Sequence, residues 1–184
     1  EKKRSALKQS IHSLDEWLKT LNIRVSMSKP DAGSITRTGQ LLNKTNQMNL
    51  STRRMTELEL VQWLEDPNHH LWTFRVSDKF GDSGLTGIVS LEVTGDEAVI
   101  VDFILSCRVI GRKIEETMVA RAIHFSKDMH LARVKARYVP TPRNKPCLEF
   151  LKRSGFTADA DGHNFYWEMD KDYLYPEQVF IEAL

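Results

Sequence analysis

The stretch DFILSCRVIGRKIEE, Asp102–Glu116, decides the fold, because an apolar run gives way there to basic residues, one glycine and a charged helix start. Residues 97–107 are typical of a strand, and residues 112–129 have the spacing of an amphipathic helix. A helix that begins here directs unpaired backbone N–H groups and the positive end of its dipole at the turn. The turn is therefore either a phosphate-binding site or an ordinary strand-to-helix connection.

Further strands and helices are expected on both sides of this turn. The apolar spacing predicts helices over residues 4–21, 35–46, 57–66, 112–129 and 143–156. Alternating patterns predict strands over residues 22–28, 70–78, 84–93, 97–107, 132–139 and 163–169. Thr56 and Glu59 form a predicted capping box, and Gly155 is placed to end the last helix. The order indicates an α+β fold with one mixed, mostly antiparallel sheet and helices on both faces.

Composition limits the function classes. The chain has 184 residues, of which 41% are hydrophobic, which suits one domain with a sizeable core. The net charge of +1 and the lack of a long apolar run predict no nucleic-acid partner and no membrane segment. Two cysteines are too few for a disulfide framework and lack metal-site spacing, so we expect a cytoplasmic protein without a metal. The chain begins with Glu1 rather than Met, which indicates a domain of a longer protein.

Two motifs resemble those of the GNAT acyltransferase superfamily. They are carried by the turn at Arg108 and Gly111, and by a later segment with Asn144, Phe150, Gly155 and Phe156. The resemblance implies a GNAT-like fold in which the turn at Arg108 and Gly111 holds the coenzyme pyrophosphate and the segment at Asn144 meets the pantetheine arm. For a phosphopantetheine arm, the candidate phosphate-binding residues are Arg108, Gly111 and Arg112, and Asn144 is the candidate partner of the arm's amides. Asn144 is alternatively only a helix cap.

This sequence departs from the GNAT pattern at two positions. Lys113 stands where the superfamily prefers Gly or Ala, and Leu151 stands where it prefers a Tyr that acts as general acid. Both departures count against ordinary transfer from acetyl-coenzyme A, although coenzyme A stays an alternative cofactor.

A polar segment, residues 41–60, is unusually rich in amides. Amides and an arginine in a loop suit either recognition of hydroxyls and carbonyls or rigid bonding within the loop. The candidate substrate-binding residues are Asn43, Asn46, Gln47, Asn49 and Arg54.

Four stretches together resemble the C-terminal domain of FkbH-like proteins of polyketide biosynthesis. They are residues 41–54, 78–89, 102–116 and 138–156. The resemblance implies transfer of a glyceryl group, derived from 1,3-bisphosphoglycerate, onto the phosphopantetheine thiol of an acyl carrier protein. It also implies an upstream HAD-type phosphatase domain. The expected division is a connector helix at residues 1–21, a GNAT-like domain at 22–170 and a C-terminal tail at 171–184.

Cys107 is the candidate catalytic residue, a nucleophile that holds the glyceryl group as a thioester. The alternative interpretation makes it a small core residue at the end of its strand. His70 and His163 are candidate bases for the thiol. Two other functions stay open: an acetyl-coenzyme A-dependent acetyltransferase, and a non-catalytic module that docks the carrier protein.

Overall fold

The computed structural model describes residues 13–182, which form a single nine-stranded mixed sheet. The strands are β1 (Ile23–Ser28), β2 (Met48–Asn49), β3 (His69–Asp78), β4 (Gly81–Thr94), β5 (Glu97–Leu105), β6 (Arg133–Arg137), β7 (Thr157–Ala158), β8 (Asn164–Glu168) and β9 (Val179–Glu182). The spatial order is β7-β8-β6-β5-β4-β3-β1-β9, and β2 pairs with β5. Only β1–β9 and β5–β6 are parallel among these pairs, so the predicted mostly antiparallel sheet is confirmed.

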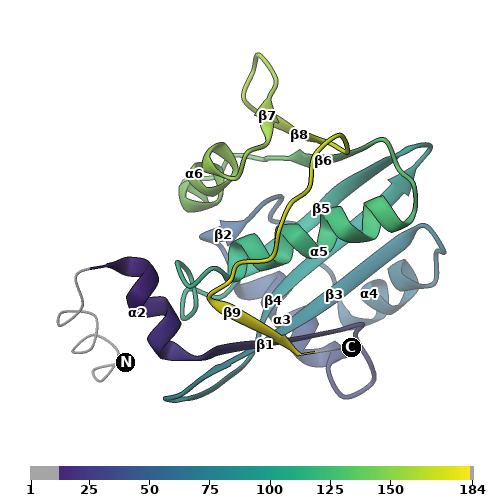
Figure 1. The fold of residues 1–184 in the computed structure, drawn as a ribbon. Helices are drawn as coiled ribbons and strands as arrows, with labels where there is room; N and C mark the ends of the chain where they lie inside the picture. Colours follow the sequence, from purple (N-terminus) through teal and green to yellow (C-terminus); the bar gives the residue numbers. More distant parts are fainter. Residues whose placement is uncertain (1–12, 183–184) are drawn as a thin grey trace.

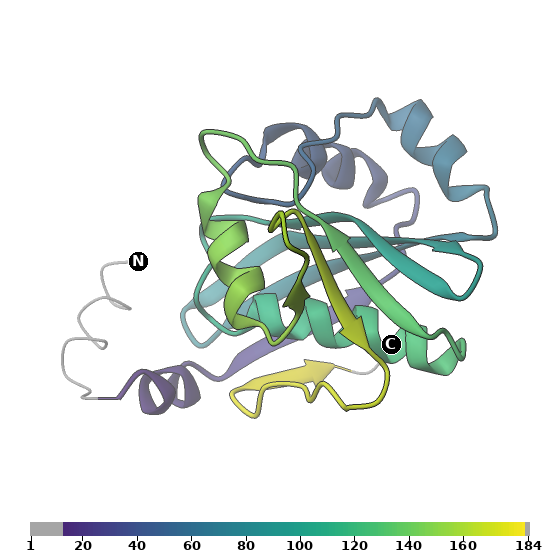
Figure 2. The same cartoon turned by 90° about the horizontal axis from the view of Figure 1, so that it is seen from above.

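Helices cover both faces of the sheet. The described helices are α2 (Leu14–Leu21), α3 (Ile35–Lys44), α4 (Glu57–Leu64), α5 (Ile114–Asp128) and α6 (Lys145–Arg153). In Figure 1, α5 lies across one face of the sheet, and in Figure 2 it lies on the opposite side of the strands from α3 and α4. A large apolar cluster packs under α2, α5 and α6, and a smaller one packs under α3 and α4.

The helix ends follow local chemistry. The predicted capping box is present at α4, where the Thr56 side chain accepts from the Glu59 N–H and the Glu59 carboxylate accepts from the Thr56 N–H. Gly155 adopts φ +86° after α6, as predicted for the end of that helix. Helix α5 begins at Ile114 rather than Arg112, because Lys113 has a left-handed φ of 65°. One continuous helix over residues 4–21 was predicted, and this is wrong: α2 begins at Leu14, because Ser13 has an extended backbone (φ −117°) and its hydroxyl accepts from the Glu16 N–H as an N-cap. Residues 4–12 lie outside the described range.

Strands β5 and β6 stop pairing part of the way along β5. A register shift between Ser90 and Leu91 leaves Val101 as an extra residue on β5, which is a β-bulge. Strand β6 pairs with β5 only as far as Ile100 and Ala136. Beyond that point β2 pairs antiparallel with the last residues of β5, Ile104 and Leu105. The sequence does not predict this short strand.

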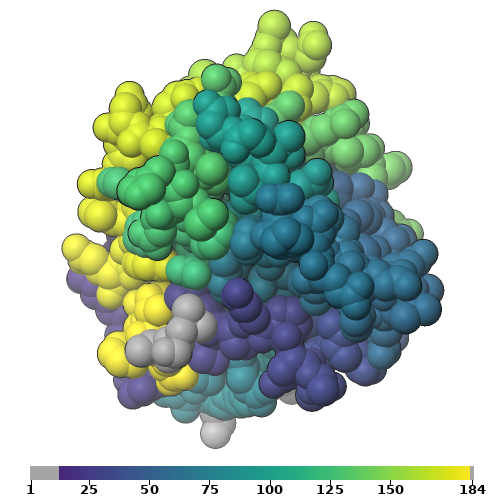
Figure 3. Space-filling model, turned by 90° about the vertical axis from the view of Figure 1, so that its right-hand side faces the viewer, coloured from purple at the N-terminus to yellow at the C-terminus, as the bar shows by residue number. Residues whose placement is uncertain are grey.

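Both ends of the described chain pack on the domain. In the predicted connector, Trp17, Leu18 and Leu21 are buried in the large cluster. The predicted tail adds strand β9, which runs parallel to β1. Before β9 the chain crosses α5, where the His124 ring nitrogen Nε2 lies 2.7 Å from the Tyr173 carbonyl oxygen. Figure 3 shows this edge, with the C-terminal stretch in yellow beside the green end of α5.

Candidate functional site

A pocket of about 890 Å³ lies beside the end of β5. Three segments line it: α3 with the residues after it, the turn after β5, and the loop before α6. The lining residues are Arg37, Gln40, Leu41, Lys44, Thr45, Asn46, Gln47, Leu105, Ser106, Cys107, Arg108, Pro142 and Arg143. We call this the cysteine pocket, because it contains a thiol among polar and basic side chains.

The cysteine pocket carries a surplus of positive charge. Four of its lining residues are Lys or Arg and none is Asp or Glu. The Arg37 guanidinium donates to the Gln40 side-chain oxygen at 3.1 Å, and Arg108 donates to the Ser106 hydroxyl at 3.3 Å. Within the described residues, none of the four cations has a carboxylate partner at ion-pair distance. The pocket therefore suits an anionic ligand.

Cys107 is exposed in this pocket. Strand β5 ends at Leu105, so Cys107 belongs to the turn and not to the strand. The alternative interpretation of Cys107 as a core residue is therefore wrong. Cys147 is the buried cysteine, and burial raises the pKa of its thiol to about 12, which leaves it protonated and unreactive at neutral pH.

The Gly111 N–H group, at the turn before α5, is already bonded within the chain. Gly111 has φ +76°, a conformation that favours glycine, and its N–H donates to the Glu115 carboxylate at 2.7 Å. Glu115 is only 1% exposed, and burial is the main cause that raises the pKa of its carboxyl. The second carboxylate oxygen, Oε2, is buried without a hydrogen-bond partner. The chain's own acidic side chain therefore occupies the start of α5.

Arg112 lies in the protein interior and does not line the cysteine pocket. Its guanidinium pairs with the Asp78 carboxylate at 3.3 Å, and the two side chains are only 7% and 2% exposed. This buried pair attaches the turn to the end of β3. Contact between Arg112 and a phosphate stays a prediction, and in this structure its charge is balanced internally.

Asn144 is fully buried, and its amide makes four hydrogen bonds within the protein. Its oxygen accepts from the Tyr138 hydroxyl at 2.7 Å and from the Thr141 N–H at 2.8 Å. Its nitrogen donates to the Asn49 carbonyl at 3.0 Å and to the Val139 carbonyl at 2.9 Å. The side chain does not cap α6, and a ligand could reach this amide only if the surrounding loop opened.

The segment after α3 fills the space between β5 and the chain that follows β6. Leu50 N–H donates to the Phe103 carbonyl at 3.2 Å, and Val139 N–H donates to the Leu50 carbonyl at 3.0 Å. Met48, Asn49 and Leu50 are all buried. A phosphopantetheine arm therefore could not lie between β5 and the chain after β6 without displacing this segment.

Some residues of the amide-rich segment bond within the loop, and others face the cysteine pocket, so both predicted roles are represented. Asn43 bonds the backbone of Met55 through both amide atoms, and Asn49 bonds the Thr45 carbonyl and the Thr52 N–H. Arg54 bonds the Leu42 carbonyl and the Asn46 side chain. These contacts make the loop rigid. Asn46 and Gln47 line the cysteine pocket, where a substrate could meet them.

Three basic residues of the pocket were not among the predicted site residues: Arg37, Lys44 and Arg143. Arg37, Gln40 and Lys44 follow helical spacing, so they share one face of α3. The helical spacing in the sequence could therefore have identified Arg37 and Lys44 as neighbours. The sequence around Arg143 has no comparable pattern, because the position of Arg143 depends on how the loop before α6 folds.

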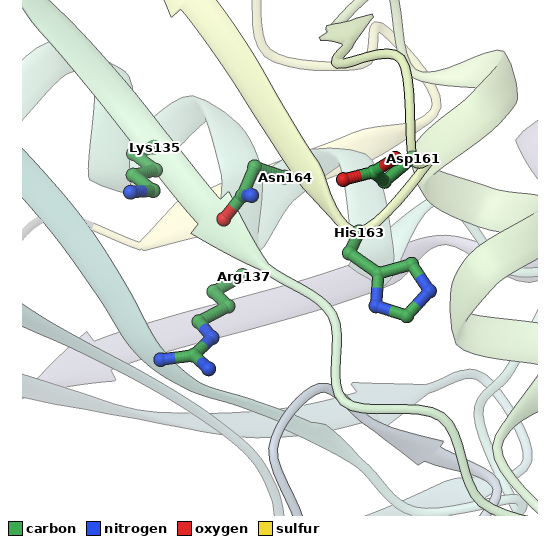
Figure 4. Close-up of a pocket in the computed structure, with 5 residues that line it drawn as sticks. All are labelled: Lys135, Arg137, Asp161, His163 and Asn164. Atoms are coloured by element: carbon green, nitrogen blue, oxygen red, sulfur yellow. The ribbon is translucent and has the colours of Figure 1, made fainter.

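A second pocket, of about 680 Å³, lies over β6 and β8 (Figure 4). Its lining residues are Lys135, Arg137, Asp161, His163 and Asn164, and it shares none with the cysteine pocket. His163, one of the candidate bases, therefore lies in this second pocket.

The other candidate base is also elsewhere. The His70 ring lies 4.4 Å from the Phe125 ring, between centroids, and burial lowers its pKa. Neither His70 nor His163 lines the cysteine pocket. Among residues 13–182, no group of three or more metal-ligating side chains is arranged to hold an ion, and no helix could span a bilayer.

Neither the known family models nor the curated proteins include a match to this sequence. Solved structures do match. Ard1 from Thermoplasma volcanium aligns at TM-score 0.62 and 12% identity over 80% of this chain and 99% of its own. Spermidine N-acetyltransferase from Vibrio cholerae, in complex with CoA and spermine, aligns at 0.60 and 17% over 80% and 96%. The ribosomal-protein-S18-alanine N-acetyltransferase from Escherichia coli aligns at 0.56 and 9% over 80% and 95%. The predicted GNAT-like architecture is confirmed: the chain has the fold of the GNAT N-acetyltransferases.

Proposed function

We propose that the domain is an acyltransferase in which Cys107 exchanges an acyl group with a phosphopantetheine thiol. The observation that carries the proposal is the exposed Cys107 thiol in a concave pocket with four cations and no carboxylate. On the FkbH-like resemblance, the acyl group is glyceryl and the thiol belongs to an acyl carrier protein. The proposal also includes an upstream HAD-type phosphatase domain and a cytoplasmic location.

The proposed reaction is a balanced thioester exchange. The Cys107 sulfur attacks the thioester carbonyl carbon, a new carbon–sulfur bond forms, and the bond to the arm's sulfur breaks. The arm leaves as a thiolate and takes up the proton that Cys107 gives up. Because reactant and product are both thioesters, the protein mainly has to position two sulfurs and stabilise one oxyanion. The amides of Asn46 and Gln47, which line the same pocket, are the proposed donors for that oxyanion.

Because protein fills the space between β5 and the chain after β6, we propose that the arm enters through the cysteine pocket. An arm that reaches Cys107 from the pocket mouth does not have to displace Leu50 from its hydrogen bonds to Phe103 and Val139. It also leaves the Glu115 contact with Gly111 intact.

A second candidate function is acyl transfer from acetyl-coenzyme A. It is favoured by the similarity to solved structures that contain coenzyme A, among them the PaiA N-acetyltransferase from Thermoplasma acidophilum, with TM-score 0.59 and 14% identity. This function needs no cysteine, so loss of Cys107 should leave it intact.

Intact-protein mass spectrometry tests the proposal. The protein is mixed with a glyceryl thioester of a phosphopantetheinylated carrier protein, and separately with acetyl-coenzyme A. A gain of one glyceryl group that is lost in Cys107→Ala and kept in Cys147→Ala supports the proposal. Acetyl transfer to an amine that survives Cys107→Ala supports the second function. Carrier binding with neither a Cys107 adduct nor acetyl transfer to an amine contradicts both functions and supports a docking module.

A further inference from the structure

The strongest unexplained feature outside the reaction itself is the group of cations around Cys107. Arg37 and Lys44 come from α3, Arg108 from the turn after β5, and Arg143 from the loop before α6. Three separate parts of the chain therefore bring positive side chains into the cysteine pocket. Gathering like charges is unfavourable unless an anion binds among them.

We infer that Arg37, Lys44 and Arg143, together with Arg108, form a binding site for a phosphate ester of the substrate. The inference rests on the proposed function for the identity of that substrate. The phosphate belongs either to the pantetheine arm or to a phosphorylated acyl group. Both sources have the same chemistry, a tetrahedral dianion or monoanion that guanidinium groups bind with paired hydrogen bonds.

The first supporting observation is that no carboxylate within residues 13–182 neutralises the four cationic side chains. Hydrogen bonds to Gln40 and Ser106 hold Arg37 and Arg108 without cancelling their charge. No described carboxylate within residues 13–182 pairs with Lys44 or Arg143. Lys44 and Arg143 are exposed and Arg37 is half-buried, so a ligand can reach all three.

The second step concerns the start of α5, the other place where a phosphate could bind. There the Gly111 N–H is bonded to the Glu115 carboxylate, and the Arg112 guanidinium is paired with Asp78. A phosphate at that turn would meet a buried acidic side chain and a cation that is already balanced. The cysteine pocket has neither obstacle, so the anion site belongs on the side of β5 that faces α3.

Isothermal titration calorimetry separates the two sources of phosphate. One pair of ligands is 4′-phosphopantetheine and pantetheine, and the other is 3-phosphoglycerate and glycerate. The phosphorylated member of at least one pair should bind about tenfold or more tightly than its partner, because a charge-assisted hydrogen bond contributes on that scale. The pair that shows the preference identifies the source.

Variants locate the site. Arg37→Ala/Lys44→Ala and Arg143→Ala should each remove about tenfold or more of the phosphate preference. The matched control is Lys135→Ala/Arg137→Ala, which removes two cations from the second pocket and should leave the preference unchanged. Circular dichroism confirms that each variant is folded.

The outcomes also distinguish this inference from the proposed function. No phosphate preference in either pair, or equal losses in the site and control variants, overturns the anion site. If Cys107 is nevertheless acylated at the same rate by donors with and without phosphate, the proposed function stands alone. Selective phosphate binding without a Cys107 adduct supports the anion site and contradicts the proposed function.

Discussion

The Glu115 carboxylate accepts a hydrogen bond from the Gly111 N–H at 2.7 Å, across the turn that begins α5. A negative side chain at this place is favourable, because the helix start carries partial positive charge and unpaired N–H groups. Its burial is unfavourable, since one oxygen has no partner. The turn therefore contains an internal carboxyl group that competes with any external anion for this N–H.

The pH dependence of stability should reveal this carboxyl. Burial raises the pKa of Glu115 above its ordinary value near 4.5, so the folded state holds a proton that the unfolded state has lost. The free energy of unfolding should then fall as the pH rises from about 4.5 through the raised pKa. In Glu115→Gln this fall should be smaller. Urea denaturation between pH 4 and pH 8 measures the slopes, and parallel curves for the two proteins would contradict the prediction.

The two thiols should differ strongly in reactivity. Cys107 is exposed and Cys147 is buried with its pKa raised to about 12. We expect iodoacetamide at pH 8 to label one thiol of the native protein quickly, and Cys107→Ser to abolish that fast labelling. Cys147 should react only when urea unfolds the chain. Peptide mass mapping assigns the label, and fast labelling of Cys147 in native protein would show that the α6 region opens readily.

The fold was largely predictable because its main elements carry strong local patterns. Helix α5 has an apolar face, and Thr56 with Glu59 marks the start of α4 within the sequence itself. Alternation predicted β3, β4 and β5, although the end of β5 was placed two residues late, at Cys107 rather than Leu105. Elements that depend on tertiary pairing were missed. Strand β2 has only two residues, too few to show a period, and it exists because β5 leaves an edge for it.

The site was less predictable than the fold. Cys107 and Arg108 could be chosen because the turn is a recognisable local pattern, and both line the pocket. Asn144 also belongs to a recognisable pattern, yet four internal bonds occupy its amide. Which polar side chains face a pocket and which hold a loop together depends on distant partners. Asn49, for example, is 95 residues from the Asn144 that binds its carbonyl.

The buried ion pair between Arg112 and Asp78 should be important for stability. Removing one partner of a buried ion pair usually costs about 3–5 kcal/mol. Asp78→Ala should therefore destabilise the domain by about that amount. Glu149→Ala removes one partner of an exposed pair with Lys152 at 3.8 Å and should cost less than about 1 kcal/mol. Thermal denaturation of both variants measures the difference, and similar melting temperatures would contradict the prediction.

The last prediction concerns the segment that separates β5 from the chain after β6. Asn144→Ala removes four hydrogen bonds, of which two are buried and two are partly buried, and leaves the Asn49 and Val139 carbonyls without the donor they share. We expect a loss of about 3 kcal/mol or more, since each unsatisfied buried group costs about 1–3 kcal/mol. The Leu50 and Val139 amides should also exchange with deuterium faster, because they pair across the same segment.

Asn43→Ala is the matched control for this change. Asn43 is exposed, and within residues 13–182 its amide bonds only the backbone of Met55, so the variant should leave exchange at Leu50 and Val139 unaltered. The affinity for coenzyme A, measured on the wild type and both variants, tests whether this segment affects ligand binding. Tighter binding in Asn144→Ala than in the wild type would mean that this segment excludes the ligand from the space between the strands. Tight binding by the wild type, with protection of Leu50 unchanged, would mean that coenzyme A binds elsewhere, and the cysteine pocket is then the place to look for it.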